Sequence, residues 1–212
     1  MIPLLALFGF LSGSVLYSEL LPRLFRGVDI REQADDHNPG ATNAFKYGGF
    51  GLGLFSLICD LAKGFLPIQF ALHFITPSTS GFSLVLCAPV LGHAFSPFAH
   101  FKGGKAIAAS FGVLLALLPM DPLVFHLAFW FILFSTLLRI RPHAARTICA
   151  FALTAMRAAL SSVPPVAMGT TLILLTTTYR HRASLHAEPF RLYFLKKQLW
   201  PPHSEHLSIF TR

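Results

Sequence analysis

Residues 48–75 read GGFGLGLFSLICDLAKGFLPIQFALHFI, and this stretch decides the fold class. Only two charged side chains, Asp60 and Lys63, interrupt it. A helix needs roughly 20 apolar residues to cross the hydrocarbon core of a bilayer, so the stretch is long enough to span a membrane. The whole chain has the same character, because 54% of its 212 residues are hydrophobic and only 12% are charged. Soluble proteins carry about 25% charged residues, so we predict an outer surface that faces lipid.

Further apolar runs lie on both sides of this stretch. Several are shorter than a full span and require flanking residues or a thinned bilayer. We predict an all-α, polytopic membrane protein with about seven transmembrane helices, and counts of five or six stay open. The apolar start of the chain lacks a basic region and a small-residue cleavage site, so we interpret it as a retained span rather than a signal peptide. The predicted spans are 2–21, 48–75, 82–98, 106–118, 123–138, 147–160 and 163–179.

The connections between these runs alternate in charge. Three of them, 76–81, 119–122 and 161–162, contain neither lysine nor arginine. With seven spans, all basic connections fall on one side, which the positive-inside rule makes cytoplasmic, with the N-terminus outside and the C-terminus inside. The net charge of +8 is then mostly a topology signal, and we expect membrane lipids rather than nucleic acid as partners. The basic residues of these connections are Arg23, Arg26, Arg31, Lys46, Lys102, Lys105, Arg139, Arg141, Arg146, Arg180 and Arg182.

The sequence GHAFSPFAHFKGGK at 92–105 has the composition of an anion-binding turn. Gly103 and Gly104 allow a ligand to approach the backbone closely, and Lys102 and Lys105 supply positive charge. A glycine-rich turn that opens a helix also presents free backbone N–H groups to an anion. We predict phosphate binding here, and the alternative is a flexible basic loop that meets anionic lipid headgroups.

The connection 22–47 contains a second polar motif, NPGATN at 38–43. Structureless loops longer than about 12–15 residues usually have a function or are disordered. Short hydrogen-bonding side chains around Gly40 suit the wall of a site for a polyhydroxy or phosphate ligand, with the Gly40 backbone N–H exposed. Asn-Pro-Gly is also an ordinary turn, so the motif alone is a weak signal.

Asp60 and Lys63 lie three residues apart inside the predicted span 48–75. This spacing places them on one helix face, where they can form an ion pair. Ionisable groups within a span are costly and usually face a cavity or one another. Two interpretations stay open: a structural ion pair beside a kink at Gly64 and Pro67, or a pair linked to a substrate or solute.

Taken together, the motifs resemble the bacterial membrane acyl-phosphate:glycerol-3-phosphate acyltransferases, the PlsY family. The resemblance rests on NPGATN at 38–43, DLAKG at 60–64 and GHAFSPFAHFKGGK at 92–105, with Gly13-Ser14 and RGVDIR at 26–31 as further similarities. It implies seven spans and an active site on the cytoplasmic side of the bacterial inner membrane. It also implies acyl transfer from acyl phosphate to the sn-1 hydroxyl of glycerol 3-phosphate, and we expect neither a metal nor a cofactor.

The resemblance also implies roles for individual residues. Both substrates carry phosphate, which lysine side chains and backbone donors can bind. Acyl phosphate is already activated, so positioning and charge stabilisation suffice without an enzyme nucleophile. Lys102, Gly103, Gly104 and Lys105 are expected to hold phosphate, Asn38, Thr42 and Asn43 to orient the acceptor, and His93 to bind phosphate or accept a proton. Gly40, Lys46, Arg180, His181 and Arg182 complete the expected substrate-binding set.

The chain departs from the family pattern at several positions. Asp36-His37 stands where the family usually has Ser-Gly, Lys46 stands for an arginine, and Ala144 and Ser184 stand for a serine and an asparagine. A carboxylate about 5 Å from a phosphate would cost ~3 kcal/mol at an effective dielectric constant of about 20. Asp36 must therefore point away, pair with a cation, act as general base for the acceptor hydroxyl, or accompany a different substrate.

The similarity covers residues 1–182, which we expect to form one acyltransferase domain. Residues 183–212 form a basic and aromatic tail, predicted to be cytoplasmic. Within it, 190–200 suits an interfacial helix that Pro201 and Pro202 end. A loosely ordered polar tail is the alternative.

Other functions stay open beside acyl transfer to glycerol 3-phosphate. An enzyme with a different acceptor, or a relative without catalysis, would account for Asp36. A small transporter or lipid-binding membrane protein would account for an ion pair within a span. The transporter is less favoured, because transporters usually show inverted repeats and paired broken spans, and the sequence shows no such repeat.

Overall fold

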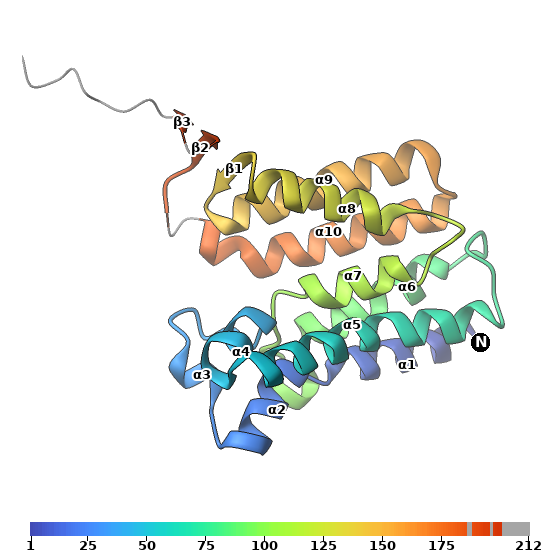
Figure 1. Ribbon diagram of the computed structural model, residues 1–212. Coiled ribbons are helices and arrows are strands. Elements are labelled where there is room, and N and C mark those ends of the chain that lie inside the picture. The colour runs from blue at the N-terminus through green and yellow to red at the C-terminus, as the bar shows by residue number, and fades with distance from the viewer. Residues whose placement is uncertain (186–187, 196, 201–212) are drawn as a thin grey trace, which may run out of the picture.

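The computed structural model describes residues 1–185, 188–195 and 197–200 (Figure 1). As the apolar runs predict, the described chain is mainly helical, and three short strands form one small sheet. The elements are α1 (Ile2–Ser14), α2 (Tyr17–Arg26), α3 (Ile30–Gln33), α4 (Ala41–Gly48), α5 (Phe50–Leu72), α6 (Phe82–Ala94), the 3-10 turn η1 (Pro97–Ala99), α7 (Ile107–Leu115), α8 (Leu123–Ser135), β1 (Leu138–Arg141), α9 (His143–Ser161), α10 (Pro164–Leu185), β2 (Arg191–Phe194) and β3 (Lys197–Trp200).

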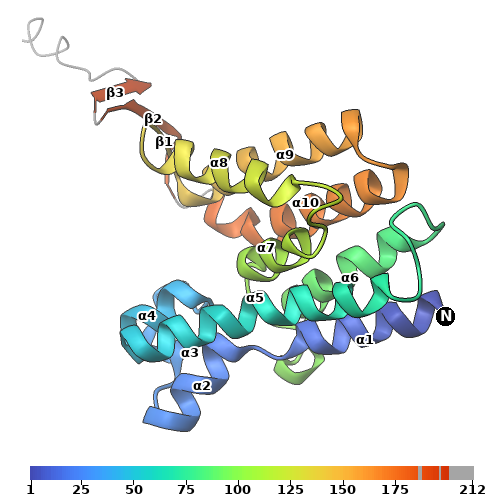
Figure 2. The same cartoon turned by 45° about the vertical axis from the view of Figure 1, so that its right-hand side comes forward.

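The long helices form two groups (Figures 1 and 2). One group contains α1, α5 and α6, with the short helices α2, α3 and α4 at one end, and the other contains α8, α9 and α10. Helix α6 contacts both α1 and α10, and α7 contacts both α5 and α8. These two helices therefore join the groups into a single bundle.

Glycines allow the helices of this bundle to cross with their backbones in contact. A Cβ atom at Gly13 of α1 would lie 2.0 Å from the Pro89 carbonyl oxygen of α6, and one at Gly92 would lie 2.0 Å from the Phe10 carbonyl oxygen. At Gly64 a Cβ atom would lie 2.3 Å from a carbonyl oxygen of α7. Such crossings at small residues are typical of membrane helices. Gly64 thus serves a helix contact inside a continuous α5.

Two helical segments of the described chain are long and apolar enough to cross a membrane, Phe50–Leu72 and Phe82–Ala99. The pair Ile2–Ser14 and Tyr17–Arg26, which is bent by 41°, adds a third if it acts as one broken span. The remaining apolar runs each contain one of the shorter or less apolar helices α7 to α10. The helical class is confirmed, whereas the count of seven spans and the orientation of the termini stay predictions.

The ion pair of the apolar stretch lies at the break between α1 and α2. The Lys63 ammonium lies 2.7 Å from the Asp60 carboxylate, and both side chains are buried. Lys63 also donates a hydrogen bond of 2.5 Å to the Val15 carbonyl oxygen, and the Ser18 hydroxyl donates one of 2.5 Å to Asp60. A helix break leaves backbone and polar groups to be satisfied, and this pair satisfies them. Both charges of α5 are therefore partnered by protein groups.

The connection 22–47 is folded rather than a loose loop. Gly27, with a φ of 66°, ends α2 in the left-handed conformation that favours glycine. The Asp29 carboxylate then caps α3 by accepting hydrogen bonds from the backbone N–H groups of Arg31 and Glu32. Gly40 begins α4. The NPGATN motif is thus placed around the first turn of a helix.

The C-terminal segment forms strands, and the interfacial helix that the sequence predicts over 190–200 is wrong. Strand β2 pairs antiparallel with β1 and β3 pairs antiparallel with β2. Leu192 lies opposite Ile140, and both pack on the helical core, while Tyr193 lies opposite Arg139. This alternation has the period of two that a half-buried strand requires. Helix α10 runs to Leu185, past the predicted domain limit at 182, and Pro201 and Pro202 lie outside the described residues.

Candidate active site

The turn 102–105 lies directly on the end of α6. The Gly104 backbone N–H donates a hydrogen bond of 3.0 Å to the His93 carbonyl oxygen. A Cβ atom at Gly103 would lie 1.9 Å from that oxygen, and one at Gly104 would lie 2.3 Å from His93 Nε2. Both positions therefore require glycine, because the turn packs without a gap against the histidine. His93 itself is buried beneath the turn.

Two arginines from other elements hold the same turn. Arg180 of α10 donates from Nε to the Gly104 carbonyl oxygen at 3.1 Å and from Nη2 to the Gly103 carbonyl oxygen. Arg31 of α3 donates from Nη2 to the Lys102 carbonyl oxygen at 2.6 Å. Three successive carbonyl groups are thus fixed by guanidinium groups, which orients the turn and the Lys105 side chain at its end.

A carboxylate lies where the two polar motifs meet. Lys105 Nζ is 2.8 Å from Asp36 Oδ2, and Asn43 Nδ2 donates to Asp36 Oδ1 at 2.9 Å. The Asn38 backbone N–H donates to the same oxygen at 3.3 Å. Partial burial by itself raises the pKa of the Asp36 carboxyl, but the hydrogen bonds from Lys105 and Asn43 outweigh it, and the pKa is lowered. Asp36 is therefore ionised at neutral pH, and its three hydrogen-bonding neighbours form an anion-binding arrangement.

Two stacked histidines lie near this ion pair. The rings of His143 and His181 are 6.3 Å apart between centroids and inclined by 17°. His181 Nδ1 lies 2.8 Å from the Thr177 carbonyl oxygen, which assigns the proton to Nδ1 and leaves Nε2 as an acceptor. Nε2 is buried and has no hydrogen-bond partner among the described residues. Burial lowers the pKa of His181 to about 4, with a further contribution from the Lys105 charge. The ring is therefore neutral at pH 7.

Four of the expected residues do not join this cluster. The Lys46 ammonium lies over a neighbouring tyrosine ring, 4.7 Å from its centroid, and the Arg182 guanidinium lies over another at 3.8 Å. Thr42 and Lys102 are exposed. Lys102 contributes its backbone carbonyl to the site through Arg31. The cluster thus contains one of the two lysines of the turn.

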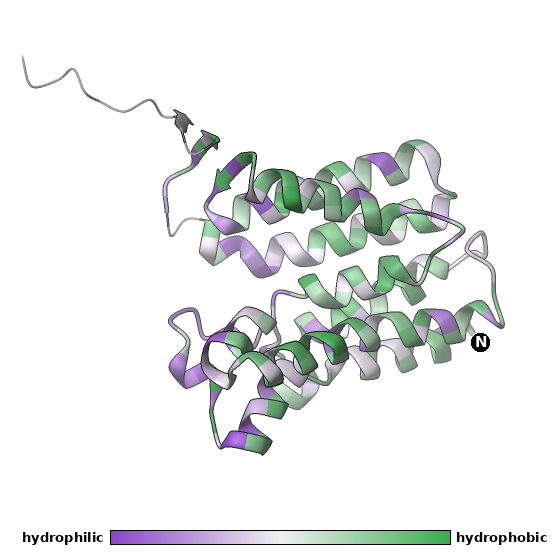
Figure 3. Ribbon diagram, viewed as in Figure 1, coloured by the Kyte–Doolittle hydropathy of each residue, from purple (hydrophilic) through white to green (hydrophobic). Residues whose placement is uncertain are grey.

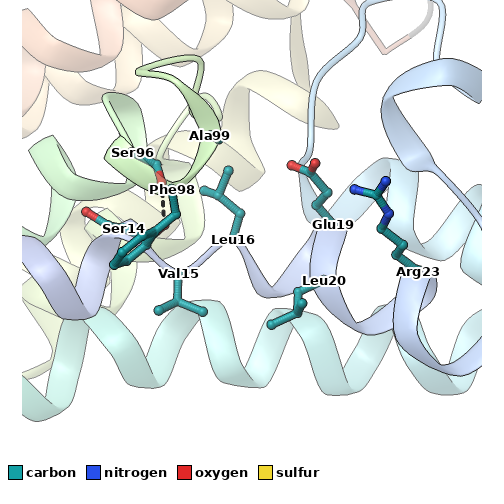
Figure 4. Close-up of a pocket in the computed structure, with 9 residues that line it drawn as sticks. All are labelled: Ser14, Val15, Leu16, Glu19, Leu20, Arg23, Ser96, Phe98 and Ala99. Carbon is teal, nitrogen blue, oxygen red and sulfur yellow. Dashed lines mark hydrogen bonds between the residues drawn. The ribbon is translucent and has the colours of Figure 1, made fainter.

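A cavity of about 340 Å³ opens at the break between α1 and α2 (Figure 4). This volume falls in the range of small-molecule sites, roughly 300–1,000 Å³. Apolar side chains line it, and Glu19 and Arg23 stand at one end. Glu19 lies 2.8 Å from Arg31 Nε, so one arginine joins the cavity to the turn. The lining residues are Ser14, Val15, Leu16, Glu19, Leu20, Arg23, Ser96, Phe98 and Ala99.

Comparison with known proteins places this arrangement in a family. The family described as glycerol-3-phosphate acyltransferase matches residues 3–187. The chain belongs to this family. A glycerol-3-phosphate acyltransferase of Desulfovibrio desulfuricans is 42% identical over 126 residues, which cover 59% of this chain and 51% of that protein. Glycerol-3-phosphate acyltransferase 2 of Thermotoga maritima is 38% identical over 137 residues, which cover 63% and 67%. The matched part of the chain therefore spans about half the length of the first relative.

Solved structures of the acyltransferase family have the same fold. A crystal structure of PlsY (YgiH), an integral membrane glycerol 3-phosphate acyltransferase in the glycerol 3-phosphate form, has a TM-score of 0.76 and 27% identity to this chain. The superposition covers 87% of this chain and 90% of that one. The lysophosphatidic acid form has a TM-score of 0.72 and 25% identity. The likeness thus extends over nearly the whole bundle.

Two residues of the candidate site could not be assigned to it from the sequence. Arg31 belongs to the RGVDIR segment, but the sequence does not show that it reaches the Lys102 carbonyl group. His143 belongs to no motif in the sequence, yet it stacks on His181. Its position beside Ala144, which aligns with a family serine, is the one signal that points to it.

Two backbone N–H groups that the sequence suggests as phosphate donors are not free to bind an anion. The Gly104 N–H is bonded to the His93 carbonyl oxygen at 3.0 Å, and the Gly40 N–H to the Asn38 carbonyl oxygen at 2.9 Å. Both donors are occupied because the glycines serve close packing and a tight turn. The donors that remain for an anion are therefore side chains, chiefly those of Lys105 and Asn43.

Proposed function

We propose that this chain is an acyltransferase that moves a fatty acyl group from acyl phosphate to the sn-1 hydroxyl of glycerol 3-phosphate. One observation carries the proposal: Lys105, the Asn43 amide and the Asn38 N–H converge on a single anion, the Asp36 carboxylate. Charged and amide donors in this arrangement suit a phosphate group, and both substrates bear one. The Asp36 carboxylate thus marks the position that a phosphate oxygen would take.

The reaction requires no covalent intermediate on the enzyme. The sn-1 oxygen attacks the acyl carbon, a new ester C–O bond forms, and the C–O bond to phosphate breaks. The hydroxyl proton leaves with the phosphate, so the products are lysophosphatidate and hydrogen phosphate. Positive charge at Lys105 stabilises the phosphate oxygens, and fixing the two substrates side by side lowers the entropic part of the barrier.

The surrounding side chains then act mainly by positioning. The free Nε2 of His181 suits a hydrogen bond from the acceptor hydroxyl. Its lowered pKa makes it a weak base, so it orients the hydroxyl rather than deprotonating it. Arg180 and His93 contact the backbone of the turn. Their effect on the reaction passes through the placement of Lys105.

Asp36 fits best as a displaceable partner of Lys105. Of the four possibilities that the sequence leaves open, pairing with a cation agrees with the 2.8 Å contact. A carboxylate whose pKa is lowered by that contact is a poor general base near neutral pH. The phosphate of a substrate therefore competes with Asp36 for the lysine.

The membrane arrangement is part of the proposal. Seven spans, formed by α1 with the start of α2 and by α5 to α10, cross the bacterial inner membrane, with the N-terminus outside and the C-terminus inside. Hydrophilic segments gather at the end of the bundle that contains α2, α3, α4 and the last turns of α10 (Figure 3). The positive-inside rule supports a cytoplasmic location for this end of the bundle. The candidate site lies at the same end.

Turnover by the purified full chain tests the proposed reaction. Detergent-solubilised protein is incubated with acyl phosphate and glycerol 3-phosphate, and lysophosphatidate and phosphate are both measured. Equal amounts of the two products, formed only when glycerol 3-phosphate is present, are expected. Lys105→Gln should abolish most of the turnover, while Arg26→Gln, which removes a charge at the end of α2, should retain it. Phosphate release that does not depend on the acceptor would contradict the assignment.

A relative without catalysis is the second candidate, favoured by Asp36 in place of a family serine. In that case the natural chain is inactive and Asp36→Ser gains acyl transfer. The observation that suggested a transporter no longer supports one. Asp60 and Lys63 pair with each other and with groups at the α1–α2 break, so neither charge is left for a solute.

A further inference from the structure

The small sheet carries a second cluster of positive charge, outside the acyltransferase site. In the antiparallel register, Arg141 lies directly opposite Arg191, and Arg139 lies opposite Tyr193. Opposed residues, and residues two apart on one strand, point to the same side of a sheet. These four side chains therefore share one side, here called the arginine face, and its three arginines are exposed.

The opposite side of the sheet fixes the direction of the arginine face. Ile140 is buried in the hydrophobic core, and Leu138 and Leu192 pack against that core. A slip of one residue in the pairing would exchange the two sides and expose these apolar groups. The arginine face must therefore point away from the helices, at the end of the bundle where the sheet projects (Figures 1 and 2).

The charge on this face is not balanced within the described part of the chain. Like charges directly opposite one another destabilise a strand pair, and the ion pairs among the described residues involve other cations. Arg146, at the start of α9, adds a fourth guanidinium. Burial lowers its pKa, the nearby charges of Arg139 and Arg141 lower it further, and its Nε is buried without a hydrogen-bond partner. The arrangement calls for an anion from outside.

We propose that the arginine face is a docking surface for the phosphate headgroups of anionic phospholipids. Guanidinium groups bind phosphate through two parallel hydrogen bonds. Phe190 and Leu195, which directly precede and follow β2, are 48% and 64% exposed. Exposed apolar and aromatic side chains beside arginines are characteristic of the membrane interface. The surface is thus matched to a bilayer in both charge and polarity.

The proposal depends on a membrane-embedded bundle and not on acyl transfer, so it can fail independently of the proposed reaction. Full-length protein in mixed micelles is titrated with phosphatidylglycerol or with phosphatidylcholine, and its melting temperature is recorded. The test variant is the double substitution Arg141→Gln with Arg191→Gln. The matched control, Arg23→Gln with Arg26→Gln, removes the same charge from α2.

Phosphatidylglycerol should stabilise the parent and the control, and phosphatidylcholine should not. Each arginine near an anionic surface contributes roughly fivefold in affinity, so the double variant should bind phosphatidylglycerol about thirtyfold more weakly. In phosphatidylcholine alone the variant should melt no lower than the parent, because a repulsive pair has been removed. If the arginines had a merely structural role, the variant would instead melt at a lower temperature than the parent in phosphatidylcholine.

Three results would overturn the proposal. They are equal stabilisation of parent and variant by phosphatidylglycerol, an equal loss in the control, and a lower melting temperature of the variant in phosphatidylcholine. Inorganic phosphate at matched concentration distinguishes a lipid site from a free-anion site, because it should not reproduce the stabilisation. If the double variant does not fold, the salt dependence of the parent tests the proposal instead. Its stabilisation by phosphatidylglycerol must disappear at about 1 M salt, where the Debye length is about 3 Å.

Discussion

Replacing Asp36 with asparagine removes one negative charge from the candidate site and keeps the shape of the side chain. A phosphate bound at Lys105 would lie about 5 Å from the Asp36 carboxylate and be repelled by ~3 kcal/mol at an effective dielectric constant of about 20. The Asp36 side chain is 42% exposed, so water screening reduces this repulsion to ~1–2 kcal/mol. The Asp36→Asn variant should therefore bind glycerol 3-phosphate about five- to thirtyfold more tightly.

Steady-state kinetics of acyl transfer at varied glycerol 3-phosphate measures this effect. The expected result for Asp36→Asn is a KM that falls by about fivefold or more, with kcat nearly unchanged. Asp35→Asn is the matched control, because it removes a neighbouring exposed carboxylate that forms no ion pair among the described residues. Its KM should stay within about twofold of the parent value.

The opposite pattern would refute the reasoning. If Asp36 accepts the proton of the acceptor hydroxyl, Asp36→Asn should lower kcat by roughly 10²–10⁴-fold and leave KM alone. Loss of kcat in Asp36→Asn, with normal kinetics in Asp35→Asn, would make Asp36 a general base. It would also end its assignment as a displaceable partner of Lys105.

Three further predictions follow from other contacts. Gly103→Ala places a Cβ 1.9 Å from the His93 carbonyl oxygen, so the free energy of unfolding should fall by ~1–3 kcal/mol; an unchanged melting temperature would contradict this packing. Lys63→Met leaves Asp60 buried and unpaired and should lower that free energy by ~3–5 kcal/mol, with most of it recovered when Asp60→Leu is added. His181, neutral in the fold with a pKa of about 4, stabilises the fold fully above its unfolded value of about 6.5 and loses that stability as pH falls. Thermal melts at pH 7.5 and 5 should therefore show ~2 kcal/mol of extra acid destabilisation in the parent relative to His181→Gln.

Local patterns in the sequence were sufficient to predict the helices. The apolar runs predict the long helices because lipid-facing helices must be apolar along their length. The two glycines between Lys102 and Lys105 predict that a ligand can approach the backbone closely, whereas in the structure both glycines pack against His93. The resemblance to the acyltransferase family implies that 38–43 and 102–105 line one site, and in the structure Lys105 reaches Asp36 beside Asn43.

Contacts between distant parts of the chain could not be predicted in this way. The pairing of Arg139 with Tyr193 depends on a strand register across two helices, and the sequence 190–200 suits an interfacial helix equally well by local criteria. In the sequence, Arg31 is one of several basic residues in a basic connection, and nothing distinguishes it from the others. Only the fold brings it to the Lys102 carbonyl oxygen. The same holds for Asp36, whose meaning depends on a partner 69 positions away.

Binding of radiolabelled glycerol 3-phosphate, measured by equilibrium dialysis, tests most directly whether Lys105 grips the substrate phosphate. A hydrogen bond to a charged group contributes ~1.5–3 kcal/mol, so Lys105→Gln should weaken binding by about ten- to hundredfold. Lys102→Gln, which removes an exposed lysine of the same turn, should weaken it by less than about threefold. Equal losses in the two variants, or unchanged binding in Lys105→Gln, would contradict the account.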